Sequence, residues 1–315
     1  MSKSLFLQNI IAVIWDFDKT LSPHYMQTPL FEHYGVEEAM FWREANALPD
    51  FYAKAGITVQ PDTCYLGHLL TYVQQGVMPG LSNALLRELG ASIKFYNGIP
   101  EIFSSLKTIL DLPKYQEGDL RLEHYVVSTG LAEMIRGSAI APYLSGVWAS
   151  EFIETPAPPH FSAADKPKAS EITQIAGFLD NTTKTRSIFE INKGVNKRSD
   201  IKVNDMLPEE ERRVPVRNMV YIADGPSDIP SFSVIREHGG LAYAVYKSGS
   251  SRHFAQVDRL LRTGRVDACG PADYCKGGQT TLWLERQVTR IADRMMKERL
   301  RTLENNVKRG PEHNV

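Results

Sequence analysis

Cysteine is scarce in this chain, neither sign of charge is in excess, and long hydrophobic runs are missing. The odd number and the spacing of Cys64, Cys269 and Cys275 indicate neither a disulfide framework nor a zinc cluster. Lysine and arginine number 36 against 37 acidic residues, which gives no electrostatic footprint for nucleic acid and no polybasic membrane anchor. No run of ~20 apolar residues and no targeting signal occurs, so we expect a cytoplasmic protein without nucleic-acid or membrane partners.

Five short apolar segments end in polar or small residues and predict buried strands. They cover residues 10–15, 124–127, 146–150, 219–223 and 241–246. Near-continuous apolar character without clean alternation is typical of parallel strands that are covered on both faces. The segments between them are long enough for helical crossovers. The sequence therefore predicts an α/β fold with a three-layer parallel sheet.

Two long gaps interrupt the strand pattern, and one long helix follows it. Residues 22–96 carry apolar residues at three- and four-residue spacing, which predicts a helical block inserted as a separate small domain. Residues 192–217 are polar and charged, which predicts an exposed excursion. Residues 284–306 predict an amphipathic helix that packs on the core or forms a homodimer contact. The expected units are a core (1–21 and 97–283), a helical insertion (22–96), and a C-terminal helix and tail (284–315).

Two pairs of aspartates follow predicted strands. Asp16 and Asp18 come directly after the first strand, where side chains two residues apart project to the same side. Asp224 and Asp228 follow the fourth predicted strand on a turn that contains glycine and proline. Open α/β sheets bind ligands at the carboxyl ends of their strands. Like charges gathered there repel each other unless a cation or a shared proton compensates, which favours a hard divalent metal such as Mg²⁺. The alternative for the first pair is a solvated acidic turn.

Two further segments carry groups suited to a phosphate. The second strand ends at Ser128, whose hydroxyl and following turn N–H groups can hold phosphate oxygens. Thr182 or Thr183 can cap a helix that has Lys184 in its first turn. The helix dipole does not favour a lysine there, which indicates a separate reason for it; the alternative is an ordinary solvated lysine.

Taken together and in this order, these segments resemble the haloacid dehalogenase (HAD)-like hydrolase superfamily, nearest to its phosphoserine phosphatase-like branch. The resemblance spans residues 10–246 and implies a Rossmann-like sheet with a lid. The insertion lies where the superfamily has a helical C1-type cap. The motifs that carry the resemblance are Asp16-Phe17-Asp18-Lys19-Thr20, Ser128, Lys184 and Asp224-Gly225-Pro226-Ser227-Asp228.

The resemblance implies a role for each aspartate. Asp16 would be the nucleophile that forms an aspartyl-phosphate, and Asp18 would be the general acid and then the general base. Asp16, the backbone carbonyl of Asp18, and Asp224 would hold Mg²⁺, which neutralises charge on the transferring group. Asp228 would support the site from a second shell or through water.

The resemblance also implies how the phosphoryl group is bound. Ser128 and Lys184 would bind its oxygens, and Lys193 is the alternative for the lysine role. The implied function is a Mg²⁺-dependent phosphomonoesterase for a small phosphorylated metabolite. The alternatives are a phosphotransferase or phosphomutase on the same site, or a non-enzymatic binding protein on a retained fold.

The residues that determine substrate specificity are harder to identify from the sequence. The segment after Thr20 lacks the early acidic residue expected to hold an amino group, which argues against phosphoserine itself. Candidate lid contacts are His24, Tyr25, Trp42 and Arg43. For each of these, core packing or solvent exposure is the other interpretation.

Overall fold

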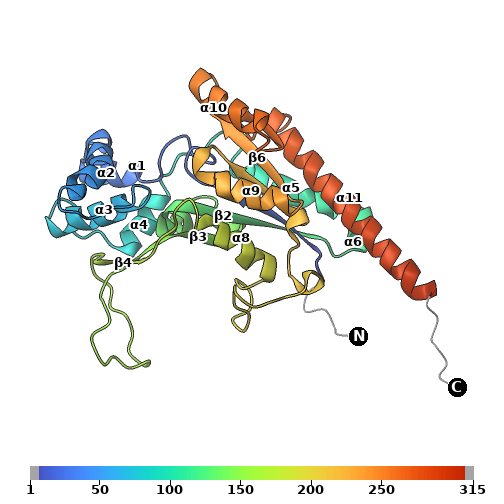
Figure 1. Cartoon of the computed structure of the whole chain (residues 1–315), viewed down its shortest axis with the longest axis horizontal. Coiled ribbons are helices and arrows are strands. Elements are labelled where there is room, and N and C mark those ends of the chain that lie inside the picture. Colours follow the sequence, from blue (N-terminus) through green and yellow to red (C-terminus); the bar gives the residue numbers. More distant parts are fainter. Residues whose placement is uncertain (1–6, 309–315) are drawn as a thin grey trace.

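A mostly parallel sheet forms the centre of the molecule. The computed structural model describes residues 7–308 (Figure 1). The seven strands lie in the order β4-β3-β2-β1-β5-β6-β7, and every neighbouring pair is parallel except the antiparallel pair of β3 and β4. Their bounds are β1 (Ile10–Trp15), β2 (Arg121–Leu131), β3 (Leu144–Ile153), β4 (Gln174–Gly177), β5 (Met219–Ala223), β6 (Leu241–Tyr246) and β7 (Ala268–Pro271).

Burial in β1 explains why the sheet has helices on both faces. All six residues of this strand are buried, and successive side chains belong to two different hydrophobic clusters. One cluster contains Ile11, Val13 and Trp15 together with α5 (Glu101–Thr108), α7 (Ala132–Gly137) and α11 (Gln279–Lys308). The other contains Ile10, Ala12 and Ile14 together with α8 (Lys184–Lys193), α9 (Ile229–Glu237) and α10 (Ser251–Arg262). The predicted three-layer α/β architecture is confirmed.

The strand predictions were confirmed in part. Strands β1, β5 and β6 have the predicted bounds, whereas β2 and β3 extend several residues beyond the predicted segments. The sequence did not predict β4 or β7. Strand β4 is exposed at the edge of the sheet and lacks an apolar run, and β7 has only four residues, which end in glycine and proline.

Four helices occupy the long gap after β1, as the apolar spacing predicts. They are α1 (Thr28–Tyr34), α2 (Glu38–Ala53), α3 (Cys64–Gln74) and α4 (Asn83–Gly90), and they gather at one end of the molecule (Figure 1). Helix α4 packs closely on α7, because a Cβ on Gly90 would overlap the Met134 carbonyl oxygen and one on Gly137 would overlap that of Arg87. The insertion is thus joined to the core by a tight helix contact, and its division into a separate domain stays a prediction.

The C-terminal helix α11 runs along the opposite side of the molecule from the insertion (Figure 1). Its predicted apolar stripe is buried against the core, with Leu284, Val288, Ile291 and Met295 all inside the hydrophobic cluster. Packing on the core therefore accounts for the stripe, and a homodimer contact stays a prediction. Among residues 7–308, no helix combines the length and the apolarity that a membrane span requires.

The predicted excursion over residues 192–217 is only partly exposed. Asn192 donates a hydrogen bond to the Val214 carbonyl (2.8 Å) and accepts one from the Val214 N–H (3.1 Å). Val214 and Arg213 are buried, so the end of the segment returns to the core. The prediction of an exposed excursion is confirmed only in part, because an arginine in a charged run can be buried when it pairs with Glu123 (2.6 Å). The remaining elements are α6 (Pro113–Gln116) and the short 3₁₀ segments η1 (Ile109–Asp111), η2 (Ala141–Tyr143), η3 (Glu209–Glu211), η4 (Val216–Asn218) and η5 (Pro226–Asp228).

Candidate active site

The register of three central strands brings the predicted site residues to one edge of the sheet. Trp15, the last residue of β1, pairs with Val126 in β2 and with Ile222 in β5. Asp16 follows directly on β1, and Ser128 and Asp224 each lie two residues beyond the paired positions. Asp16, Ser128 and Asp224 line a pocket of about 570 Å³, and Asp18 and Lys184 line it as well. Parallel alignment of the strands therefore assembles the pocket from distant parts of the chain.

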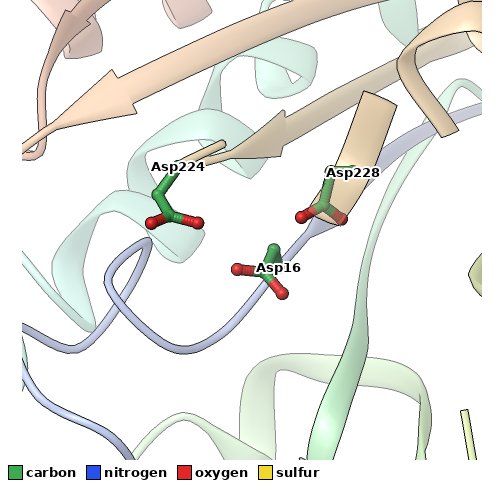
Figure 2. Close-up of side chains that lie close together, drawn as sticks. All are labelled: Asp16, Asp224 and Asp228. Carbon is green, nitrogen blue, oxygen red and sulfur yellow. The ribbon is translucent and has the colours of Figure 1, made fainter. Parts of the chain in front are cut away.

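Three carboxylates meet at this edge. Asp16, Asp224 and Asp228 each place an oxygen within 4.8 Å of the others (Figure 2). Asp16 comes from the end of β1, Asp224 from the turn after β5, and Asp228 from the end of η5. Such a set of hard oxygen donors is the kind that magnesium prefers.

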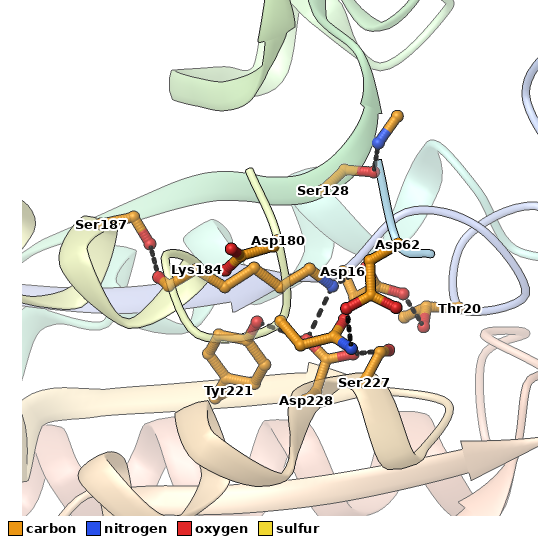
Figure 3. A network of polar contacts seen from close by, with 12 residues as sticks. Asp16, Thr20, Asp62, Ser128, Asp180, Lys184, Ser187, Tyr221, Ser227 and Asp228 are labelled. Atoms are coloured by element: carbon orange, nitrogen blue, oxygen red, sulfur yellow. Dashed lines mark hydrogen bonds and ion pairs between the residues drawn. The ribbon is translucent and has the colours of Figure 1, made fainter. Parts of the chain in front are cut away.

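Lys184 lies between two of these acids. Its Nζ is 2.8 Å from Asp16 Oδ1 and 2.9 Å from Asp228 Oδ1 (Figure 3), and the lysine is 1% exposed. Burial alone would lower the pKa of this amine, but the two carboxylates raise it well above its usual value. Lys184 is therefore a fixed positive charge. Lys193 instead donates to the carbonyl oxygens of Val203 (2.6 Å) and Asp205 (2.7 Å), outside this cluster.

The start of α8 positions Lys184. Lys184 is the first residue of the helix, and Thr183 is at the N-cap but makes no side-chain cap bond. The Asp180 carboxylate instead accepts hydrogen bonds from the N–H groups of Thr182 (2.9 Å) and Thr183 (2.6 Å). The prediction that a threonine side chain caps this helix was wrong, because an aspartate three residues before the cap competes for the same N–H groups.

Asp18 is held beside Asp16 by the chain that follows it. Its Oδ1 accepts a hydrogen bond from the Met26 N–H (2.7 Å). Burial, and then repulsion by Asp16, raise the pKa of Asp18 to about 8. A carboxyl group with such a pKa carries a proton near neutral pH, which a general acid requires.

The pKa values of Asp16 and Asp224 are raised as well, first by burial, with repulsion between the acids adding to both changes. Burial raises the pKa of Asp16 to about 6, although the Lys184 ammonium opposes this change. Burial, followed by the charges of Asp16 and Asp228, raises the pKa of Asp224 to about 7. A divalent cation between these oxygens would relieve the repulsion, so the donor set fits the expected Mg²⁺.

Asp228 is the most enclosed acid of the cluster. It is fully buried, and it accepts hydrogen bonds from Lys184 (2.9 Å), the Tyr221 hydroxyl (2.7 Å) and the Ser227 hydroxyl (2.8 Å). Figure 3 shows these donors around its carboxylate. Three donors hold Asp228 rigidly, and through Lys184 it also fixes the position of Asp16.

The C-terminal end of β2 forms the opposite wall of the pocket. Ser128 is buried, and its Oγ accepts a hydrogen bond from the Gly130 N–H (3.0 Å). The Thr129 carbonyl accepts one from the Tyr65 hydroxyl in α3 (2.7 Å). Ser128 thus lies where its hydroxyl can meet a ligand in the pocket, and the insertion contacts the same end of β2.

Several pocket residues could not be found from the sequence. Tyr25 and Trp42 line the pocket as candidate lid contacts, whereas His24 and Arg43 lie outside its lining. Residues that no motif marked also line it: Gln27, Asn46, Pro61, Asp62, Tyr65, Asn181, Arg252, His253 and Gln256. They come from helices and turns far apart in the chain, and only the tertiary arrangement brings them together.

The arrangement of the sheet and its helices identifies a known fold. The chain has a HAD-like fold, as its superposition on a solved hydrolase of that family shows. A solved HAD family hydrolase from Salmonella enterica serovar Typhi superposes with a TM-score of 0.50 at 13% identity, over 88% of this chain and 70% of that chain. A phosphoserine phosphatase solved as a phospho-aspartyl intermediate analogue gives a TM-score of 0.45 at 16% identity, over 83% and 93% of the two chains.

At the level of sequence, the chain belongs to the same protein family as an uncharacterized protein of Borreliella burgdorferi. The two are 36% identical over 287 residues, which cover 89% of this chain and 97% of the Borreliella protein. A scan against protein-family models gives no match.

Proposed function

We propose that the chain is a Mg²⁺-dependent phosphomonoesterase that acts on a small phosphorylated metabolite through an aspartyl-phosphate. The observation that carries this proposal is the pairing of Asp16 with Lys184 at 2.8 Å inside a pocket that Asp18 also lines. The Lys184 ammonium keeps one oxygen of Asp16 oriented, and the neighbouring carboxyl group of Asp18 holds a proton. A nucleophile and a general acid therefore face the same space.

The reaction would proceed in two displacements. An oxygen of Asp16 attacks phosphorus, the ester P–O bond breaks, and Asp18 gives its proton to the leaving oxygen. A water molecule then attacks phosphorus and gives a proton to Asp18, and the bond between phosphorus and Asp16 breaks to release phosphate. Ser128 and Lys184 would hold the phosphoryl oxygens in both steps.

The acidic cluster would hold the metal. Asp16, Asp224 and the backbone carbonyl of Asp18 would bind Mg²⁺, which would neutralise charge on the transferring group. Asp228 would position Lys184 and Asp16 through its hydrogen bonds.

The helical insertion would act as a lid. Asp62, in the turn before α3, accepts a hydrogen bond from Asn181, which precedes α8 (2.8 Å). Tyr25 and Trp42 contact each other with ring centroids 4.9 Å apart on the same side of the pocket. Closure at these contacts would exclude water and restrict the substrate to a small metabolite.

The test is phosphate release by the purified protein with Mg²⁺. The substrates are p-nitrophenyl phosphate and a panel of amino-acid, sugar, nucleotide and lipid-headgroup phosphates. We expect Asp16→Asn to abolish release, and Asp111→Asn, at an exposed position in η1, to retain it. Hydrolysis of no member of the panel by the unaltered protein would overturn the proposal. Transfer to an added sugar phosphate that outruns hydrolysis would instead assign a phosphotransferase.

A further inference from the structure

Tyr221 is a fully buried tyrosine whose hydroxyl reaches the acidic cluster from inside the core. It lies in β5, and its ring packs edge-on against Phe232 of α9, with ring centroids 5.7 Å apart. The hydroxyl donates a hydrogen bond to Asp228 Oδ1 (2.7 Å; Figure 3). A phenylalanine would fill the same space without burying a polar group, which costs stability unless that group is bonded. The tyrosine therefore differs from an ordinary core residue in its contact with Asp228.

Tyr221 shares its acceptor atom with Lys184. Asp228 Oδ1 accepts hydrogen bonds from the Tyr221 hydroxyl (2.7 Å) and from Lys184 Nζ (2.9 Å). The other oxygen, Oδ2, accepts one from the Ser227 hydroxyl (2.8 Å). Asp228 is 0% exposed, so bulk water cannot replace a donor that is lost. The Tyr221 hydroxyl thus fixes the oxygen to which Lys184 binds.

The position of that oxygen determines where Lys184 directs its hydrogens. An ammonium group has three of them in a tetrahedral arrangement. Lys184 directs one to Asp228 Oδ1 (2.9 Å) and one to Asp16 Oδ1 (2.8 Å), which leaves the third for a phosphoryl oxygen. Because two bonds fix the orientation of the ammonium, a shift of Asp228 would redirect the third hydrogen and disturb Asp16.

Loss of the Tyr221 hydroxyl would change the balance between the two carboxylates. Asp228 Oδ1 would retain the hydrogen bond from Lys184 but lose the one from Tyr221, and its charge would then attract the ammonium more strongly. The contact of Lys184 with Asp16 would loosen as a result. A misplacement of about 1 Å can lower the rate of a reaction about a hundredfold, so even a small shift is measurable.

We propose that Tyr221 is a positioning residue for phosphoryl transfer, whose hydroxyl fixes Asp228 and thereby holds the Lys184 ammonium against Asp16. The inference rests on the proposed phosphomonoesterase function and adds to it a residue from the interior of the sheet. Tyr221 is not among the residues that line the pocket, so it can act only through the residues that it contacts.

The test is Tyr221→Phe, which removes the hydroxyl and keeps the ring. With p-nitrophenyl phosphate and Mg²⁺, we expect kcat per folded molecule to fall about tenfold and KM to change less than about twofold, because orientation rather than substrate binding is impaired. Circular dichroism and urea unfolding measure the folded fraction.

Tyr243→Phe is the matched control. Tyr243 lies in the neighbouring strand β6, is 1% exposed, and pairs its hydroxyl with Thr280 Oγ1 (3.1 Å) rather than with an acid of the cluster. This variant removes the same group from the same sheet. Stability should therefore fall, but kcat should stay within about twofold of that of the unaltered protein.

The combination with Asp228→Asn distinguishes positioning from a merely structural role. If Tyr221 acts through Asp228, adding Tyr221→Phe to Asp228→Asn should lower kcat by less than about a further twofold. Two independent structural defects would instead multiply their effects on kcat.

Two results would overturn the role of Tyr221 and leave the phosphatase proposal standing. One is a kcat for Tyr221→Phe within about twofold of that for Tyr243→Phe, and the other is a combined loss equal to the product of the single losses. If the unaltered protein hydrolyses neither p-nitrophenyl phosphate nor any member of the panel of phosphate esters, the proposed function fails and the inference fails with it.

Discussion

The Lys184 ammonium lies 2.8 Å from Asp16 Oδ1, although 168 residues separate the two in the chain. Asp16 Oδ2 accepts a hydrogen bond from the Thr20 hydroxyl at 3.0 Å, so both oxygens of this carboxylate have a defined partner. Lys184 is in turn held by Asp228. This chain of contacts links the end of β1, the start of α8 and the turn after β5 into one rigid unit.

Replacing Lys184 should damage both the fold and the activity. In Lys184→Met, Asp16 and Asp228 lose the cation that pairs with them, so we expect the free energy of unfolding at pH 8 to fall by about 3–5 kcal/mol. Phosphatase activity should fall at least about a hundredfold, because a preorganised charge at the phosphoryl group is lost. Urea unfolding and steady-state kinetics measure the two effects.

Lys193→Met is the matched control for that variant. Its ammonium bonds two backbone carbonyls, those of Val203 and Asp205, so stability should fall but kcat should not. Full activity in Lys184→Met, or loss of it in Lys193→Met, would show that the lysine role has been assigned wrongly.

Magnesium should stabilise the folded protein through the acidic cluster. At a Mg²⁺ concentration ten times its Kd, binding to the native state alone adds about 1.4 kcal/mol, which raises Tm by a few degrees. Asp224→Asn should lose most of this rise because it removes one of the clustered carboxylates. Differential scanning fluorimetry with Mg²⁺ and with EDTA measures it. An equal rise in Asp224→Asn would place the metal elsewhere.

His124 should make the protein sensitive to acid. It is fully buried, with Nδ1 accepting from Trp15 Nε1 (3.2 Å) and Nε2 donating to the Phe103 carbonyl (2.9 Å). Burial lowers its pKa to about 3, whereas the unfolded chain takes up this proton near pH 6.5. The unfolded state therefore binds more protons than the native state between these values, and stability falls as the pH falls through this window.

The effect is measured by urea unfolding at pH 7 and pH 5. We expect the unaltered protein to lose about 2 kcal/mol more over this interval than His124→Gln, which lacks the titrating group. The variant itself should be less stable at pH 7, since Gln cannot reproduce both ring contacts. The exposed His160 serves as the control, and His160→Asn should follow the unaltered protein. If the stability of His124→Gln fell between pH 7 and pH 5 as much as that of the unaltered protein, the assignment of this pH dependence to His124 would be contradicted.

The contact between α4 and α7 should tolerate no added methyl group. Gly90→Ala places a Cβ against the Met134 carbonyl and should cost about 1–3 kcal/mol of unfolding free energy. Gly67→Ala, in the exposed middle of α3 with open space around it, should stabilise by about 0.5–1 kcal/mol. Chemical denaturation of both variants tests this pair. A neutral Gly90→Ala would mean that the two helices can separate at little cost.

Much of the sheet and the acidic site could be predicted because local sequence determines them. A strand buried on both faces, such as β1, is recognisable from its apolar run, and the residue after it must lie at the carboxyl edge of the sheet. Asp16, Ser128 and Asp224 were located in this way. The motifs give the order of these residues along the chain. The parallel pairing of β1 with β2 and β5 brings them together in space.

The remaining features depend on contacts that no local pattern encodes. Gln27, Tyr65 and Arg252 line the pocket because segments far apart in the chain meet there. The cap on α8 was misassigned because two kinds of side chain compete for the same N–H groups and only the backbone geometry decides. Among residues 7–308, strand β4 pairs with β3 alone, at an exposed edge of the sheet, so its residues do not form an apolar run.

The most direct test of the account is to trap the phosphorylated enzyme. The protein is mixed with substrate and Mg²⁺, quenched in acid during turnover, and reduced with borohydride, which converts an aspartyl-phosphate into homoserine. Peptide mass spectrometry then locates the product. We expect homoserine at position 16, and none in Asp16→Asn. Steady phosphate release with no modified residue, or with modification at another residue, would contradict it.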